Sequence, residues 1–277
     1  MNVVTRIKSA LICVHTPLRV VCVSRNYLLA ALAASASASI FERKIMKILI
    51  TGGGCREYID SVRVVTNSSS GRTSAAISDI LAEKNSVTLV TAKSAIKAGD
   101  SSVKIVTFET GEELFLAIKN ELTQNRYDAV LHAAAVSDFV PETITVAGKT
   151  VKAGKNAKKL PSGGEMTVTF RASPKIADRL CEWAAAGGNE KAKIVCFKLL
   201  SKANESERAS AIEKLFSHSG ADFVVFNDLS EITSEKHPFE IFNKNGDCVC
   251  KGGTNKELGE KLDKILNQTQ INADAHR

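Results

Sequence analysis

From residue 46 onward, apolar and polar positions follow two rhythms along the chain. Short segments rich in apolar residues predict buried strands at 48–51, 87–90, 103–108, 129–133, 194–197 and 223–226. Apolar residues that recur every three or four positions predict helices at 74–83 and 112–122 and a closing helix at 255–266. This strand–helix alternation predicts an α/β, Rossmann-like fold, with a mostly parallel sheet and helices on both faces.

Three segments depart from the alternation. Residues 139–165 are rich in glycine and lysine and contain Pro141 and Pro161, so they are predicted to form a flap outside the core. Residues 239–242 and 248–250 flank an Asn-Gly pair, which is typical of a β-hairpin. After the flap, Ser173-Pro174 predicts the start of a further helix, with serine as N-cap and proline in the first turn.

The first 45 residues differ in charge from the rest. They carry a formal charge of +5 out of the +7 of the whole chain, so the remainder is close to neutral. That balance argues against nucleic-acid binding by the folded part. Residues 1–45 are interpreted as an organelle transit sequence, a secretory leader or translation from a start upstream of Met46, and the upstream start is favoured. Arg19 and Arg25 interrupt the apolar run, which argues against a membrane span.

The cysteines are seven in number, irregularly spaced, and include no Cys-x-x-Cys pair. This pattern argues against a disulfide framework and a zinc site, and favours reduced thiols in a cytoplasmic protein. Cys196 lies within an apolar run and is predicted to be part of the core. The predicted division of the chain is an extension at 1–45, a single domain at 46–267 and a polar tail at 268–277.

Two polar motifs accompany predicted element ends. Gly52-Gly53-Gly54 follows the first strand, where glycines either admit an anion close to the backbone or serve a tight turn with positive φ. The run Asn67–Gly71 precedes a helix, and such helix N-termini hold phosphates or carboxylates. Arg63 lies upstream and could supply a fixed positive charge. The alternative interpretation of the second motif is an ordinary serine-capped helix.

Four motifs then follow one another along the domain. They are Gly52-Gly53-Gly54-Cys55-Arg56-Glu57 continuing to Asn67-x-Ser69-Ser70-Gly71, then Ala133–Phe139, Phe197-Lys198-Leu199-Leu200 and Asn227-Asp228-Leu229. Together they resemble the phosphopantothenate–cysteine ligases over residues 46–267. The Phe-Lys-Leu-Leu form is similar to that of the monofunctional bacterial branch.

The resemblance implies a homodimeric enzyme of coenzyme A biosynthesis that uses a nucleoside triphosphate, with CTP favoured and ATP possible. It would activate the carboxylate of 4′-phosphopantothenate as an acyl-nucleotide with release of pyrophosphate, and then form an amide with L-cysteine. Mg²⁺ is expected on the nucleotide phosphates, where charge builds up, and no protein ligand is assigned to it. Because this chemistry needs no protein nucleophile, Cys55 is interpreted as structural.

The resemblance also assigns site residues. Asn67 matches the residue that holds the acyl-nucleotide, and Arg63 matches the arginine beside that substrate region. Lys158 matches the flap lysine, although a shift in the lysine-rich run would give that role to Lys155. The nucleotide-binding matches are Gly52, Gly53, Ser69, Gly71, Ala134, Ala135, Asp138, Phe197, Lys198 and Asn227.

Two residues depart from the family pattern, and two functions other than the ligase were considered. Ser74 stands where the family usually has a glycine, and Phe226 stands where a small residue is commoner. A nicotinamide-dependent short-chain reductase would need a Tyr-x-x-x-Lys pair, which the chain lacks, and an acid after the strand at 87–90. A non-catalytic nucleotide sensor would keep the glycine loops without needing Lys158.

Overall fold

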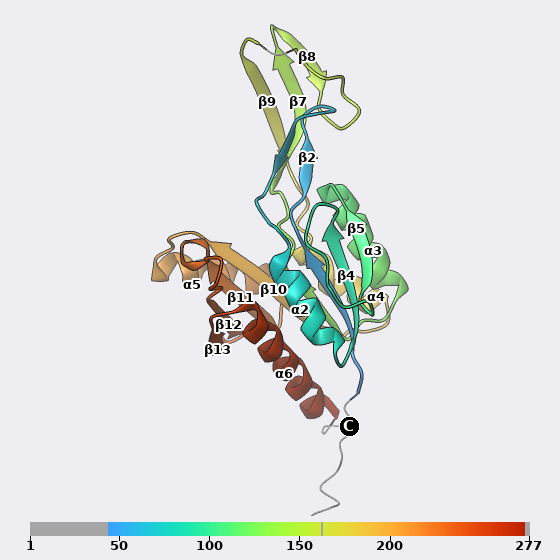
Figure 1. Cartoon of the computed structure of the whole chain (residues 1–277), viewed down its shortest axis with the longest axis vertical. Helices are drawn as coiled ribbons and strands as arrows, with labels where there is room; N and C mark the ends of the chain where they lie inside the picture. Colours follow the sequence, from blue (N-terminus) through green and yellow to red (C-terminus); the bar gives the residue numbers. More distant parts are fainter. Residues whose placement is uncertain (1–43, 162, 275–277) are drawn as a thin grey trace, which may run out of the picture. The chain divides into compact units, whose positions relative to one another are not determined.

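The computed structural model describes residues 44–161 and 163–274, with side chains described to residue 268, so all but the end of the predicted extension lies outside the described residues. An eight-stranded sheet forms the centre, in the order β13-β12-β11-β10-β6-β1-β4-β5 (Figure 1). The first six strands of this sheet along the chain are β1 (Lys47–Gly52), β4 (Ser86–Ala92), β5 (Lys104–Phe108), β6 (Ala129–His132), β10 (Lys193–Leu200) and β11 (Phe223–Asp228). These six pair in parallel, which confirms the predicted α/β class.

An antiparallel hairpin, β12 (Phe239–Asn243) and β13 (Cys248–Gly252), closes the sheet beside β11. Gly246 in its turn has a φ of 83°, as the Asn-Gly signal requires. The predicted hairpin is therefore confirmed.

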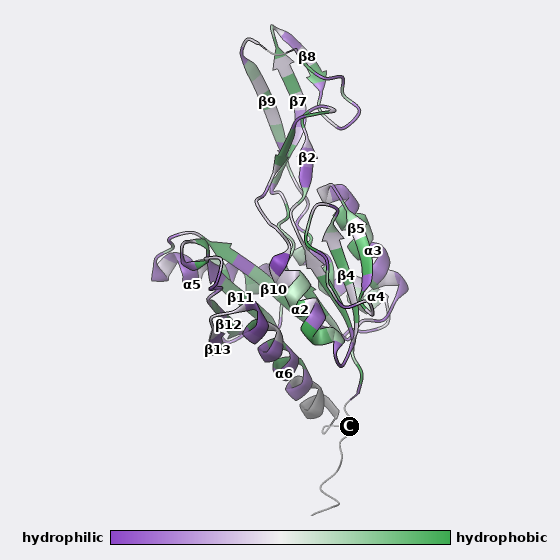
Figure 2. Cartoon of the chain, viewed as in Figure 1, coloured by the Kyte–Doolittle hydropathy of each residue, from purple (hydrophilic) through white to green (hydrophobic). Residues whose placement is uncertain are grey.

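Helices cover both faces of the sheet because β1 points alternate side chains to opposite sides. Ile48 and Ile50 pack with α2 (Arg72–Ala82) and α6 (Asn255–Asp274), whereas Leu49 packs with α3 (Gly111–Gln124) and α4 (Leu180–Ala186). A third cluster lies under α5 (Glu205–Ser219). Figure 2 shows hydrophobic residues along the strands and hydrophilic ones on the helices. No helix in the described part of the chain is long and apolar enough to cross a membrane.

A second, smaller β structure projects from this sheet and is called the arm below. It contains a two-stranded hairpin, β2 (Arg56–Tyr58) with β3 (Val64–Thr66). It also contains a three-stranded antiparallel sheet of β7 (Phe139–Val146), β8 (Lys149–Lys152) and β9 (Met166–Ala172), in the order β8-β7-β9. The predicted flap is confirmed as an excursion, and its return strand extends to residue 172.

Two helix predictions need correction, and one helix was missed. Residues 173–175 are not helical; a 3₁₀ turn, η1, begins at Ala177 and is followed by α4, because the Ser173 amide donates to the Asp138 carbonyl (2.9 Å) and continues the pairing of β7 with β9. Helix α5 was not predicted, since it buries little apolar surface. A capping box between Asn204 and Glu207 starts it. The closing helix α6 continues beyond residue 266 to Asp274.

Candidate functional site

The glycine turn lies at the carboxyl end of β1, one of the central strands. Gly53 has a φ of 80°, and a Cβ there would lie 2.7 Å from the Cβ of Ala92. A Cβ on Gly52 would lie 1.8 Å from the Ser74 hydroxyl oxygen. The turn therefore needs both the positive φ and the close approach that glycine permits. Ser74, the departure from the family pattern, lies against Gly52 and donates its hydroxyl to the Gly71 carbonyl (2.9 Å).

The N-terminus of α2 faces the same turn. Its N-cap is Gly71, with a φ of 74° and no side-chain capping bond, so the serine-capped interpretation is wrong. The Arg72 amide has only a long contact, 3.4 Å, to the Ser70 hydroxyl. A helix start without a strong cap leaves amide donors and the positive end of the helix dipole for an anion. Ser69 and Ser70 extend this polar rim.

Main-chain hydrogen bonds join the second motif to the glycine turn. The Ala135 amide donates to the Gly53 carbonyl (2.8 Å), and the Ala135 carbonyl accepts from the Cys55 amide (3.2 Å). The Ala134 amide donates to the Thr51 hydroxyl oxygen (3.1 Å). Because both alanine amides are used inside the fold, these residues can line a ligand with their methyl groups but cannot donate N–H groups to it.

Asn67 connects the second motif to the phosphate-loop candidate. Its side-chain amide donates to the Val136 carbonyl (3.1 Å), and the residue is exposed. One N–H of the amide is thereby oriented, while the other N–H and the carbonyl oxygen stay available to a ligand. Asp138, at the far end of the motif, is exposed and pairs with Lys175 (2.5 Å).

The remaining nucleotide-site candidates lie farther along the same edge. Phe197 and Lys198 are half-buried on β10, and Asn227 is buried at the end of β11. The Asn227 side-chain amide donates to the Pro238 carbonyl (2.6 Å). β1 and β11 are three places apart in the sheet, so about 14 Å separates Gly52 from Asn227. That span suits an extended ligand more than a compact one.

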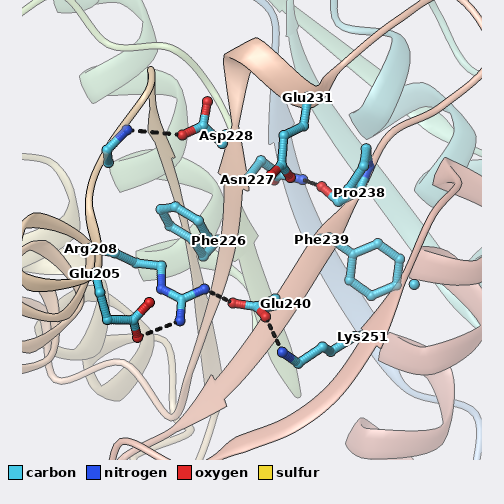
Figure 3. A pocket seen from close by; sticks show the side chains of 12 residues that line it. Glu205, Arg208, Phe226, Asn227, Asp228, Glu231, Pro238, Phe239, Glu240 and Lys251 are labelled. Carbon is cyan, nitrogen blue, oxygen red and sulfur yellow. Dashed lines mark hydrogen bonds and ion pairs between the residues drawn. The ribbon is translucent and has the colours of Figure 1, made fainter.

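A hollow of about 380 Å³ opens beside Asn227 on the α5 side (Figure 3). The ring of Phe226 forms part of its wall, and the Arg208 guanidinium lies 5.6 Å from the centre of that ring. Arg208 and Lys251 both pair with Glu240. The large residue that departs from the family pattern therefore forms part of this pocket, and its ring lies beside the partly exposed ion-pair network of Arg208, Glu240 and Lys251.

Arg63 and the Lys158 loop lie elsewhere, on the arm at the turn of the β2–β3 hairpin. Arg63 pairs with buried Asp60 (3.0 Å) and donates to the Leu160 carbonyl (3.4 Å). Asp60 also accepts from the Leu160 amide (3.2 Å). Arg63 is four residues from Asn67 along a strand, so roughly 13 Å separates their Cα atoms. Arg63 thus does not supply a charge at the α2 N-terminus within its own chain.

Comparisons with known proteins identify the family of the chain. Residues 44–268 match the family model described as the DNA/pantothenate metabolism flavoprotein C-terminal domain. The chain belongs to this family.

Family relatives include the coenzyme A biosynthesis bifunctional protein CoaBC of Thermococcus kodakarensis, 33% identical over 218 residues, which are 78% of this chain and 49% of that protein. CoaBC of Escherichia coli is 27% identical over 242 residues, 85% of this chain and 55% of that protein. The chain therefore spans about half the length of the curated relatives it matches.

Among solved structures, the DNA/pantothenate metabolism flavoprotein from Streptococcus pneumoniae superposes with a TM-score of 0.70 at 28% identity, over 81% of this chain and 99% of that chain. The Cab2 mutant H337A in complex with phosphopantothenate-cysteine shares the fold, with a TM-score of 0.64 at 18% identity over 88% of this chain and 92% of that chain.

The two flap lysines of this family member differ in their surroundings. The Lys155 ammonium pairs with Glu109 (2.7 Å) and lies 5.3 Å from the centre of the Tyr58 ring. Lys158 is exposed, and it makes no hydrogen bond or ion pair with any residue that the structure describes. Of the two, only Lys158 offers its ammonium to a ligand without first breaking an ion pair.

Two residues at the edge were missed by sequence reasoning. The Thr51 hydroxyl contacts His132 Nδ1 (2.9 Å). The Thr51 hydroxyl also accepts from the Ala134 amide, and the tautomer of the His132 ring decides which partner donates in the contact with Nδ1. Burial lowers the pKa of His132 from 6.5 to about 4, which favours the neutral ring. Thr51 and His132 each follow an apolar run in the sequence, and this was the signal by which they could have been found.

The cysteine predictions can be compared with burial. Cys55 is fully buried, and burial raises its pKa to about 12; Cys196 is buried in the core, with its pKa also raised to about 12 by burial. Thiols held protonated in this way are poor nucleophiles. The interpretation of both residues as structural is consistent with these surroundings.

Proposed function

We propose that this chain is the phosphopantothenate–cysteine ligase of coenzyme A biosynthesis. The observation that carries the proposal is the joining of the first two motifs at one sheet edge, with Asn67 bonded to the Val136 carbonyl beside an uncapped helix N-terminus. Membership of a family whose curated relatives act in coenzyme A biosynthesis supports it. The family form suggested by Phe197-Lys198-Leu199-Leu200 is the monofunctional bacterial one, and a cytoplasmic location is expected for it.

The proposed chemistry has two steps. The carboxylate of 4′-phosphopantothenate attacks the α-phosphorus of a nucleoside triphosphate, CTP in preference to ATP, and pyrophosphate leaves. The amine of L-cysteine then attacks the acyl carbon, the nucleoside monophosphate leaves, and 4′-phosphopantothenoylcysteine is formed. Asn67 orients the mixed anhydride by hydrogen bonding without competing as a nucleophile. Its Val136 contact holds it ready for that task.

The ligand would lie along the carboxyl edge of the sheet. Phosphates at the α2 N-terminus and a base near Asn227 would span the 14 Å or so between β1 and β11. Mg²⁺ would accompany the phosphates and stabilise their charge, and the described residues hold no group of three or more His, Cys, Asp or Glu that could bind a metal alone. Asp138, an exposed carboxylate of this edge that pairs with Lys175, would have to leave that ion pair to assist it.

The placement of Lys158 supports a homodimer. Hydrogen bonds tie its loop to the tip of the β2–β3 hairpin, far from its own Asn67. We therefore infer that Lys158 and Arg63 serve the site of a second copy. Exposed apolar side chains on the arm favour burial against another chain. They are Val62, Val65, Phe139, Val151, Met166 and Phe170.

A single assay tests the proposal. Pyrophosphate release is measured with CTP and with ATP, each with and without 4′-phosphopantothenate, and product formation is followed on addition of L-cysteine. Release that requires both the nucleotide and 4′-phosphopantothenate is expected, with CTP the better substrate. Nicotinamide-dependent reduction, or nucleotide binding without pyrophosphate release, would instead support one of the two rival functions.

A further inference from the structure

Glu109 contacts residues of both the main sheet and the arm. It follows β5, and its own amide donates to Glu113 Oε2 (2.7 Å) while its carbonyl accepts from the Arg56 amide (2.9 Å). Its carboxylate is largely buried, with 13% of the side chain exposed. A carboxylate fixed in this way presents two oxygens in defined directions.

Both oxygens are taken up by the arm. Tyr58, on β2, donates its hydroxyl to Glu109 Oε1 (2.5 Å). Lys155, on the flap, donates to Glu109 Oε2 (2.7 Å), and its ammonium also contacts the Tyr58 ring. Lys93, on the main-sheet side, lies 3.7 Å from the same carboxylate. The surrounding cations and the Tyr58 hydroxyl lower the pKa of Glu109 to about 2, so it stays ionised.

Beyond Lys155, the flap loop follows the hairpin closely. The Gly154 amide donates to the Ile59 carbonyl (3.1 Å), and the Ala157 carbonyl accepts from the Ser61 amide (3.0 Å). The loop that carries Lys158 is therefore joined at one end to the hairpin tip and at the other, through Lys155, to Glu109. Among the described residues, Glu109 is the side chain that anchors both the hairpin and the flap loop to the main sheet.

We propose that Glu109 is a positioning residue for the ligase reaction, which acts by holding the flap loop, and with it Lys158, at a fixed place relative to the sheet. The inference rests on the proposed function for its kinetic consequence. It also assigns Lys155 a different role from Lys158: Lys155 anchors the loop, and Lys158 meets the phosphates. Conformational freedom in the loop would then cost turnover and leave cysteine binding unchanged.

The test combines kinetics with amide hydrogen exchange on the full chain. Glu109→Ala should lower kcat roughly tenfold with little change in KM for L-cysteine, since a coupled contact of this kind is typically worth about that factor. It should also speed exchange at the amides of residues 154–160. Lys155→Met should do the same, whereas Lys152→Met, at an exposed flap position, should do neither.

A charge exchange provides the second variant. Glu109→Lys and Lys155→Glu should each impair turnover, and the double variant E109K/K155E should recover most of it, because the ion pair is restored in reverse. A double variant no better than the product of the two single effects would overturn the proposal, as would wild-type kcat in Glu109→Ala. If the wild-type chain shows no ligase activity, the proposed function fails. The exchange measurement still tests the anchor separately: faster exchange at residues 154–160 in Glu109→Ala supports it, and unchanged exchange overturns it.

Discussion

The carboxyl edge of the main sheet and the turn of the β2–β3 hairpin on the arm differ in how far charged side chains help to hold their site residues. At the edge, the glycine turn and the second motif are joined by main-chain bonds such as that from the Ala135 amide to Gly53, next to fully buried strands. At the hairpin turn, charged side chains add to main-chain bonds such as that from the Ser61 amide to Ala157: Asp60 and Arg63 bind Leu160, a residue 100 positions from Asp60 along the chain.

This difference separates two kinds of preorganisation. The edge is positioned by packing and by backbone geometry that few side-chain changes can alter, so it would serve as a rigid receptor for the proposed nucleotide. The flap loop on the arm is held by main-chain bonds together with ionic contacts on a small, exposed sheet, so its position depends in part on charge and on pH. Changes at the two places should therefore affect binding, chemistry and stability in different proportions.

The largest effect is expected for Asn67→Asp at the edge. A carboxylate of the same shape can only accept hydrogen bonds and brings negative charge close to a phosphate. Nucleotide binding by the distant parts of the site should persist, while transfer to cysteine should fall by roughly 10³-fold or more. Mass spectrometry with nucleotide and 4′-phosphopantothenate should then detect an acyl-nucleotide that accumulates on the enzyme.

Two outcomes would remove this role from Asn67. Normal product formation by the variant would be one. The other would be the complete loss of both intermediate formation and nucleotide binding, since that pattern describes a damaged pocket instead of a failed transfer.

The next largest effect is expected for Lys158→Ala on the arm. Loss of one donor to developing phosphate charge typically costs about 2.7–4 kcal/mol, so acyl-nucleotide formation should slow by roughly 10²–10³-fold. The melting temperature should stay within about 2 °C of wild type, because Lys158 is exposed and has no partner among the described residues. Near-normal turnover would shift the role to Lys155, which a parallel Lys155→Ala measurement would reveal.

The sequence alone predicts the sheet edge better than it predicts the arm, for physical reasons. Strands such as β1 and β6 are apolar runs buried on both faces, and this signal needs no knowledge of their partners. Asn67, Gly71 and the alanines of the second motif come together because the carboxyl ends of parallel strands share one edge. At the sheet edge, the apolar pattern and the parallel topology were therefore sufficient to predict which residues come together.

The arm was predicted only as an excursion. Its strands β2 and β3 are three residues long and carry no clear alternation, and their pairing with the flap depends on contacts between distant segments. Spacing along the sequence could not show that Asp60 binds Arg63 and Leu160. Helix α5 was missed for a related reason: a single buried apolar residue, Ile212, gives little periodicity.

A smaller effect, confined to the edge, is expected as the pH falls from 6.5 to 4. His132 has a pKa of 6.5 when unfolded and about 4 in the fold, because burial disfavours the charged ring. The unfolded chain then binds the extra proton first, so the stability present above pH 6.5 is lost as the pH falls toward 4. The loss should be on the order of 2–3 kcal/mol.

Chemical unfolding of wild type and His132→Leu at several pH values checks this. The variant should be less stable at pH 7, where the Thr51 contact is lost, and its stability should vary less between pH 6.5 and 4. Half-buried His237, whose pKa is also lowered by burial, contributes a slope common to both proteins. Parallel curves for the two proteins would assign the whole slope to other groups.

The smallest effect, at the arm, is expected below pH 4 and comes from Asp60. Burial alone would raise its pKa, but the Arg63, Val62 and Leu160 amides and the Arg63 guanidinium outweigh that effect and lower the pKa below 3.8. A lowered folded-state pKa gives stability that is present above the ordinary value and lost as the pH falls through the folded one.

Asp60→Asn removes the titration but turns an N–H toward the donors that the carboxylate satisfied. It should cost about 1–3 kcal/mol at pH 7, a penalty that fades as wild-type Asp60 is itself protonated. Amide exchange at Leu160, followed from pH 5 to 3, measures this locally, with the Ala135 amide at the sheet edge as internal control. The difference between variant and wild type should shrink with falling pH at Leu160 and stay absent at Ala135. Equal changes at both amides would mean that arm and edge open together, and the distinction drawn between the two regions would then be wrong.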